Sequence, residues 1–250
     1  MALLLALLPG ALVVLGLTLL EIRRGAPRGD WLINLQAWAL YVLIAVSMLP
    51  LFQWWRGTSL LDGAALPFWA AFPIFLIVTD LGEYLFHRAQ HKVPLLWSMH
   101  SLHHSDPEMS ALTTNRHFWA DQLIKSVTIW TATALVIAPT PIMVYCYIVL
   151  SMWNFVVHAN LPFDFGRFSW ALNSPSYHRR HHSRLPEHYD SNFAALFPIF
   201  DLIGGSYHRP DGFPPTGLDH APRNLREVAT WPLHHAGPAK PPAAEPVSAG

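Results

Sequence analysis

Nine of the fifteen histidines follow a repeated spacing at the ends of long apolar segments. The nine are His87, His91, His100, His103, His104, His158, His178, His181 and His182. Residues three and four apart share one face of a helix, so each spaced group can aim its imidazoles at a common point. Imidazole is the commonest side-chain metal ligand, and nine imidazoles exceed what one tetrahedral ion accepts. The pattern therefore predicts helices that converge on a pair of metal ions.

The composition favours a membrane protein. Apolar residues make up 52% of the 250 residues and charged residues 13%, whereas soluble domains carry about 25% charged residues. The formal net charge is zero, which argues against a nucleic-acid partner. Cys146, the single cysteine, lies in an apolar run and is expected in the core. A disulfide framework or a thiolate metal site is thereby excluded.

The apolar runs predict about four to five transmembrane or deeply inserted helices, each near the 20 residues that a span requires. The runs are Leu3–Leu20, Trp31–Phe52, Leu66–Phe86, Leu123–Ala138 and Ile142–Val157. Arg23, Arg24 and Arg28 make the first loop cytoplasmic by the positive-inside rule. Counting spans from that loop places all nine histidines at the cytoplasmic face. The predicted fold is all-α and integral to the membrane, with a cytoplasmic helical cap that carries the di-metal site.

Three regions follow from this organisation. Residues 1–65 form the N-terminal transmembrane helices, 66–209 the catalytic domain and 210–250 a proline-rich tail, which we expect to be disordered from Gly237 onward. The apolar stretch Phe193–Ile203 is too short to span, so it is expected to pack against the site or to lie at the membrane interface.

Two carboxylates precede the first histidine pair. Asp80 and Glu83 lie one to two helical turns before His87, on about the same face. Carboxylates behind a metal-bound imidazole fix its tautomer and raise its basicity, and ionisable groups within a span are functional candidates. The alternative is that the two carboxylates reach the aqueous interface or pair with Arg88.

The chain resembles the fatty acid hydroxylase and sterol desaturase superfamily of integral-membrane di-iron oxygenases. The resemblance rests on HRAQH with the preceding Asp80 and Tyr84, on HSLHHS, on His158 in HANL, and on SPSYHRRHH. The segment FPIFDLIGG, residues 197–205, resembles the usual ending of the family. The similarity runs from about Leu66 to Gly205.

The resemblance implies two iron ions held by the nine histidines, with O2 as co-substrate and zinc as a substitute metal. It implies oxidation of an unactivated C–H bond of a lipid, and we favour hydroxylation over desaturation. Some relatives carry a histidine where this chain has Asn154, so Asn154, His117 or His188 is a candidate tenth ligand. His208 is expected beside the site or at the surface. His220, His234 and His235 lie outside the resemblance and are read as surface residues.

Two other functions use similar ligands. A zinc-dependent membrane hydrolase needs three protein ligands and a carboxylate base, but the HExxH signature is absent and nine histidines exceed that need. A non-enzymatic metal carrier is expected to place its ligands along a path through the membrane, whereas these gather at one face. The oxygenase interpretation is therefore favoured.

The expected partners follow from the oxygenase interpretation. The sequence lacks haem, iron–sulfur and dinucleotide signatures, so a separate electron donor protein is expected. The substrate is an acyl chain of a polar lipid, a sterol or hopanoid-like ring system, or a carotenoid. The membrane is of the bacterial inner (cytoplasmic) type or ER-like. The motifs HRAQH, HSLHHS and SPSYHRRHH are the first, second and third histidine boxes. Basic residues around these boxes are expected to receive an acidic donor protein or to meet anionic headgroups: Arg88, Lys92, Arg179, Arg180 and Arg184.

Overall fold

The structure is a computed structural model that describes residues 2–26, 29–52 and 57–234. Its helices are α1 (Ala2–Arg23), α2 (Trp31–Phe52), α3 (Phe68–Lys92), α4 (Pro94–His104), α5 (Trp119–Val136), α6 (Ile142–His158), α7 (Pro175–His181), α8 (Ile199–Gly204) and α9 (Leu225–Ala229). Short 3₁₀ turns are η1 (Ala111–Asn115), η2 (Gly166–Phe168), η3 (Pro186–His188) and η4 (Trp231–Leu233). The described residues contain isolated β-bridges but no strand, so the predicted all-α class is confirmed.

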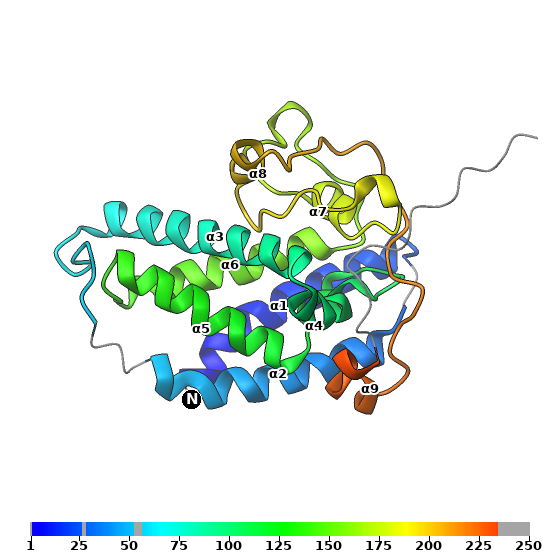
Figure 1. Cartoon of the computed structure of the whole chain (residues 1–250), viewed down its shortest axis with the longest axis horizontal. Helices are drawn as coiled ribbons and strands as arrows, with labels where there is room; N and C mark the ends of the chain where they lie inside the picture. Colours follow the sequence, from blue (N-terminus) through cyan, green and yellow to red (C-terminus); the bar gives the residue numbers. More distant parts are fainter. Residues whose placement is uncertain (1, 27–28, 53–56, 235–250) are drawn as a thin grey trace, which may run out of the picture.

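Five long helices, α1, α2, α3, α5 and α6, correspond to the five apolar runs and extend along the length of the molecule (Figure 1). The shorter α4, α7 and α9 lie toward one end, and α8 lies beside α3 (Figure 1). Among the described residues, α3 alone is both long and apolar enough to cross a membrane. Trp31–Ile44 and Ile142–His158 are shorter apolar helical stretches. The structure thus contains one candidate span by length and composition.

Helix α3 is central to the fold, since it packs against α4, α5 and α6. A buried cluster that includes Phe75 of α3, Ile137 after α5, and Cys146 and Leu150 of α6 joins α3, α5 and α6. The Cys146 thiol donates to the carbonyl of Phe72 at 3.4 Å, and the residue lies in the core as predicted. This packing brings the C-terminal ends of α3 and α6, which carry His91 and His158, to the same end of the bundle.

The histidine-bearing helices begin and end where local sequence chemistry dictates. Helix α3 stops before Val93, which is extended because it precedes Pro94, and Pro94 opens α4 at a position that tolerates the missing N–H. Pro175 likewise opens α7, where the Ser174 hydroxyl accepts from the Tyr177 amide at 3.3 Å. The histidines therefore lie near helix C-termini, whose partial negative charge favours a nearby cation.

Residues 210–234 fold back against the helices. Val228 and Trp231 are fully buried in a cluster with Met99 and Leu102 of α4. The indole N–H of Trp231 donates to the Ser101 hydroxyl at 2.8 Å. This segment therefore covers α4, which carries three of the box histidines. The predicted disordered stretch from Gly237 lies outside the described residues.

Candidate metal centre

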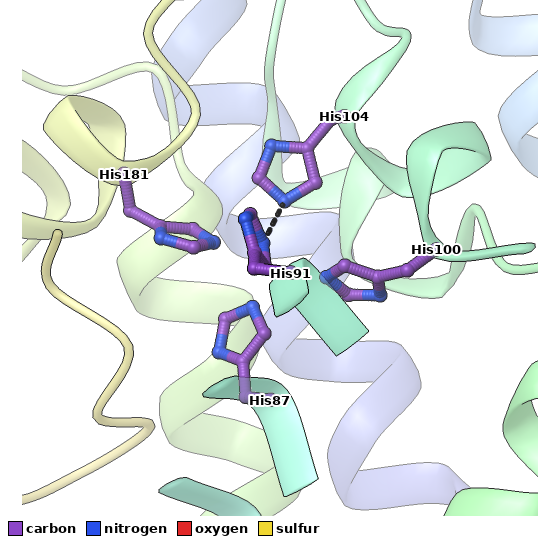
Figure 2. Close-up of side chains that lie close together, drawn as sticks. All are labelled: His87, His91, His100, His104 and His181. Carbon is purple, nitrogen blue, oxygen red and sulfur yellow. Dashed lines mark hydrogen bonds between the residues drawn. The ribbon is translucent and has the colours of Figure 1, made fainter. Parts of the chain in front are cut away.

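The first ligand group joins three helices. His87 and His91 of α3, His100 and His104 of α4, and His181 of α7 each offer one ring nitrogen, and all five nitrogens lie within 4.8 Å of one another. Figure 2 shows a ring nitrogen of each imidazole directed toward a common centre. The ring nitrogens Nε2 of His91 and His104 are 3.2 Å apart. Five predicted ligands thus converge on one point.

The second ligand group contains the other four box histidines. His103 of α4, His158 of α6, and His178 and His182 at α7 offer nitrogens that also lie within 4.8 Å of one another. Nε2 of His158 is 3.0 Å from Nε2 of His103 and 3.1 Å from Nε2 of His178. The structure therefore places all nine predicted histidines in two groups, one of five and one of four.

The spacing of these nitrogens fits metal ligation. A ligand nitrogen lies about 2.1 Å from a zinc ion, so two ligands at a right angle are about 3.0 Å apart and two in tetrahedral geometry about 3.4 Å apart. The observed separations of 3.0, 3.1 and 3.2 Å fall in that interval. Nε2 of four further box histidines is buried without a hydrogen-bond partner. These four are His87, His100, His181 and His182.

The imidazoles that α4 and α7 contribute are buried and uncharged around neutral pH. Burial lowers the pKa of His103, His104, His178 and His182 well below the ordinary histidine value. Burial also lowers the pKa of His181 to about 3. Neutral imidazole is the form that binds metal, and imidazole donors suit iron, zinc, copper and nickel. These imidazoles can therefore bind first-row transition-metal ions without first releasing protons.

Backbone carbonyls orient three of the imidazole rings through contacts with the ring nitrogen Nδ1. Nδ1 of His87 lies 2.7 Å from the carbonyl oxygen of Phe193, and Nδ1 of His181 lies 2.8 Å from that of Ser191. Nδ1 of His158 lies 2.7 Å from the carbonyl oxygen of Asn154, one turn earlier in α6. A proton on Nδ1 donates to each carbonyl and leaves the Nε2 lone pair for a metal.

The Ser191 carbonyl is presented by an unusual turn. Asp190 and Asn192 adopt positive φ angles of 58° and 59°, a conformation that Asp and Asn tolerate better than most residues. The side chain of Asn192 donates to the carbonyls of Tyr177 and His208 and accepts from the His208 amide. His208 thus contributes backbone contacts that brace this turn.

Two aspartates hold the loop that carries Phe193. Asp80 accepts from the amides of Leu196 and Phe197 at 2.9 and 2.8 Å. Asp201 accepts from the amides of Phe193 and Ala194 at 2.9 and 2.7 Å. The hydroxyls of Tyr177 and Ser206 donate to Asp201 as well. The buried loop therefore keeps its Phe193 carbonyl in place for His87. Of the stretch Phe193–Ile203, this first part packs against the site.

The structure places the two predicted carboxylates differently from the expectation. Asp80 acts on backbone amides, and Glu83 pairs with Lys125 of α5 at 2.6 Å instead of with Arg88. Within the described residues, neither carboxylate lies within 4.0 Å of an imidazole. Asp121 of α5 lies within that distance of an imidazole, since its Oδ2 is 3.4 Å from Nδ1 of His100. Sequence reasoning missed Asp121, although it stands one helical turn after His117, a residue already singled out.

The three candidates for a tenth ligand lie in different surroundings. His117 is outside the groups of five and four, and its ring stacks on that of His103 at 4.3 Å. His188 is buried but belongs to no metal-type group in the described chain. Asn154 precedes His158 by one turn, and its carbonyl also accepts from the Thr114 hydroxyl at 3.3 Å. The outlying His220 and His234 are exposed, as expected, and contact Glu227 and Thr230. His235 is outside the described residues.

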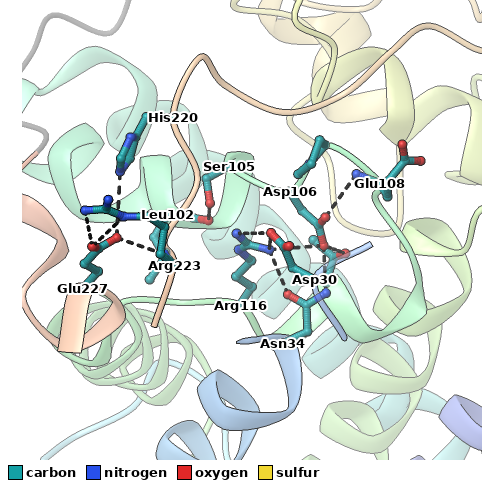
Figure 3. Close-up of polar contacts among 12 residues, drawn as sticks. Asp30, Asn34, Leu102, Ser105, Asp106, Glu108, Arg116, His220, Arg223 and Glu227 are labelled. Carbon is teal, nitrogen blue, oxygen red and sulfur yellow. Dashed lines mark hydrogen bonds and ion pairs between the residues drawn. The ribbon is translucent and has the colours of Figure 1, made fainter. Parts of the chain in front are cut away.

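A buried arginine fixes the chain that follows the second histidine box. Arg116 is fully buried and contacts Asp30, Asn34 and Asp106 at 3.1–3.5 Å. Asp106, which follows the second histidine box by two residues, also accepts from Asn34 and Thr113. Figure 3 shows this network beside a separate surface group of His220, Arg223 and Glu227. The network ties the start of α2 to the ligand-bearing α4.

Three of the five basic residues around the boxes are already engaged inside the protein. Arg88 donates to the Tyr84 hydroxyl and the Gly204 carbonyl, Arg179 is buried over the Phe213 ring, and Arg180 pairs with Asp211 at 2.6 Å. Lys92 and Arg184 are exposed, and Arg184 pairs with Asp219. Lys92 and Arg184 are therefore the members of this set that remain accessible to a partner.

Comparison with known proteins gives several relatives. Alkylglycerol monooxygenase of Xenopus tropicalis is 34% identical over 139 residues, which are 56% of this chain and 30% of that protein. The human alkylglycerol monooxygenase is 32% identical over 67% of this chain and 37% of its own length. The ornithine lipid hydroxylase OlsE of Rhizobium tropici is 28% identical over 54% of this chain and 41% of that protein. This chain thus spans less than half the length of each of these relatives. No solved structure matches it.

The family model for fatty acid hydroxylase matches residues 72–206. The matched segment begins in α3 and ends after α8, so it contains all nine histidines of the two groups together with the Asp80 and Asp201 loop supports. The match covers more than half of the chain and runs through the whole cluster, and this chain therefore belongs to the fatty acid hydroxylase family.

Proposed function

We propose that this protein is a membrane-bound di-iron oxygenase that uses O2 and externally supplied electrons to hydroxylate an unactivated C–H position of a lipid. The observation that carries the proposal is the convergence of nine imidazoles, eight of them buried, in two adjacent groups. The nine ligands of the proposed iron pair are the five histidines of the first group and the four of the second. Family membership and the lipid-oxidising relatives support the choice of reaction.

Iron bound at this site would supply the redox chemistry that activates dioxygen for attack on a C–H bond. The protein's own residues do the rest. The nine imidazoles hold the metals, and the carbonyls of Phe193, Asn154 and Ser191 fix three of the rings. Burial of the cluster excludes bulk water, which protects a reactive oxidant from side reactions. Asp80 and Asp201 keep the Phe193 loop rigid.

The proposed substrate is a polar lipid with an alkyl or acyl chain. The relatives are named for alkylglycerol and ornithine lipid, both of which combine such a chain with a polar head. A sterol-like ring or a carotenoid is the alternative, and a sterol desaturase of Gibberella zeae is among the relatives at 24% identity. Desaturation uses the same metal ligands, so the composition of the product distinguishes the two reactions. Hydroxylation adds one oxygen to the lipid, whereas desaturation removes two hydrogens.

The metal site is proposed to face the cytoplasm. Glu21, near the end of α1, accepts from the amides of Ala111 and Asn160 at 3.0 and 2.6 Å. These contacts hold the end of α1, with Arg23 and Arg24, close to the chain after His158. Basic loops stay on the cytoplasmic side, so the neighbouring metal site faces the same side. An electron donor protein would approach there, with Lys92 and Arg184 as accessible positive charges.

A zinc hydrolase is less well supported by the geometry. Such an enzyme needs a carboxylate base beside the open metal position. Within the described residues, the groups of five and four consist of imidazoles alone. Asp121 approaches His100 from Nδ1, the nitrogen that a metal bound at Nε2 leaves free. The arrangement therefore suits an imidazole-held redox pair.

The experiment that tests the function compares the lipids of native cells that produce the wild-type protein, His181→Ala or His234→Ala. A lipid that gains one oxygen with wild type and His234→Ala, but not with His181→Ala, establishes a hydroxylase and identifies its substrate. Loss of two hydrogens instead establishes a desaturase. Identical lipids in all three strains under aerobic growth would contradict the oxygenase proposal.

A further inference from the structure

Asp121 lies at a junction of three side chains from different parts of the chain. It is fully buried at the start of α5. Its Oδ1 accepts from Nε2 of Gln90 on α3 at 2.6 Å. Its Oδ2 lies 3.4 Å from Nδ1 of His100 on α4 and 3.7 Å from Nδ1 of His117. The amide of Gln90 occupies one oxygen, so the other oxygen is directed at the two imidazoles.

The contact with His100 reaches the first ligand group. His100 is one of the five residues of that group, and its Nε2 is buried without a hydrogen-bond partner. A carboxylate at Nδ1 holds the proton there, fixes the ring orientation and leaves the Nε2 lone pair for a metal. The carbonyls that hold His87, His158 and His181 are neutral acceptors, whereas Asp121 adds a negative charge behind its ring.

The contact with His117 reaches the second ligand group. The His117 ring stacks on the His103 ring with centroids 4.3 Å apart and planes 11° apart. His103 is one of the four residues of that group, whereas His117 belongs to neither group. A nearly parallel stack limits the tilt of the His103 ring. Holding His117 therefore also steadies His103.

We propose that Asp121 is a positioning residue for both metals: it orients His100 directly and His103 through the stacked ring of His117. The proposal rests on the ligand assignment of the proposed function. Within the described residues, Asp121 is the only carboxylate within 4.0 Å of a histidine of either group. Asp121, His100 and His117 also form a small group of metal-ligand type, so a third bound metal is the competing outcome.

The test uses the purified full-length chain, stripped of metal and titrated with Co²⁺, whose visible absorption reports both occupancy and coordination geometry. The wild type is expected to bind two Co²⁺ per chain. Asp121→Asn is expected to bind two with affinity lowered about 10–100-fold for each, together with a changed absorption spectrum. His117→Ala is expected to weaken one of the two sites and to spare the other. Asp62→Asn alters an exposed aspartate that contacts the Ala64 amide and no imidazole, so it is expected to retain wild-type affinity.

Wild-type affinity and an unchanged spectrum in Asp121→Asn would overturn the proposal. A third Co²⁺ in the wild type that Asp121→Asn loses would overturn it too, since Asp121 would then be a ligand. If Asp121→Asn does not fold, His117→Ala decides, and two unaltered sites in that variant contradict the proposed route to His103. A wild-type chain that folds but binds no Co²⁺ would instead refute the ligand assignment of the proposed function.

Discussion

The imidazole rings of His104 and His182 stack with centroids 4.2 Å apart and planes 15° apart, and each ring belongs to a different ligand group. His104 closes α4 and His182 follows α7, so the stack joins two segments that are distant in the sequence. His182 also meets His103 edge to face at 4.7 Å. The imidazoles of the two ligand groups therefore pack directly against one another, and a substitution in one group is expected to affect metal binding by the other.

Removing His182 is expected to cost the protein one metal. His182→Ala leaves the second group with three imidazoles and deprives His104 of its stacking partner. We expect metal content to fall from two ions per chain to about one, with loss of lipid oxidation, as measured by elemental analysis and product formation. His234→Ala, which alters an exposed ring that is hydrogen-bonded to the Thr230 hydroxyl, should retain both metals. Two tightly bound metals in His182→Ala would contradict the assignment.

Asp80→Asn is expected to lower stability and metal content together. The asparagine side chain has a single acceptor oxygen, so one of the amides of Leu196 and Phe197 loses its partner and faces an N–H group. An unsatisfied buried amide costs about 1–3 kcal/mol, and the loop that holds His87 would loosen. Thermal unfolding should shift down by about 2–4 °C per kcal/mol. Asp62→Asn, at an exposed aspartate, should stay within about 0.5 kcal/mol of wild type. Equal stabilities of the two variants would refute this role of Asp80.

Gly204→Ala is expected to disrupt the contact between α8 and α3. A Cβ at Gly204 would overlap the Tyr84 hydroxyl and come within 2.6 Å of the Arg88 guanidinium. Because Arg88 donates to both the Tyr84 hydroxyl and the Gly204 carbonyl, these groups would have to separate, at a cost of about 1–3 kcal/mol. Gly16→Ala in α1 meets nothing within 4 Å and should be neutral or stabilising by up to about 1 kcal/mol. The free energy of unfolding of the two variants tests this difference in sign.

The metal-free protein is expected to lose stability as the pH falls below about 6.5, the ordinary histidine pKa in an unfolded chain. Burial lowers the folded-state pKa of His103, His104, His178 and His182, and that of His181 to about 3. Below pH 6.5 the unfolded chain therefore binds more protons than the folded chain, and acid favours unfolding. Bound metal should oppose this loss until the ligands are protonated. Unfolding followed at pH 8, 7, 6 and 5, with and without metal, measures the effect, and a flat profile for the metal-free protein would contradict it.

Local sequence patterns were sufficient to predict the five long helices and the identity of the clustered histidines. The runs of apolar residues specify α1, α2, α3, α5 and α6 because a helix satisfies its own backbone hydrogen bonds wherever it is buried. The spacing of three and four residues places each set of box histidines on one helical face. Pro94 and Pro175 begin the ligand-bearing helices α4 and α7 because the first position of a helix does not need a backbone N–H.

Only the tertiary structure decided how the nine histidines divide and what holds them. The division into five and four separates the neighbours His103 and His104, because adjacent residues on a helix point about 100° apart. His104 therefore meets His91 of α3, whereas His103 meets His158 of α6. The roles of Asp80, Asp121 and Asp201 depend on partners far away in the sequence, among them Leu196, Gln90 and Phe193. Periodicity reports which side chains share a face, but hydrogen bonds between distant segments exist only after the chain has packed.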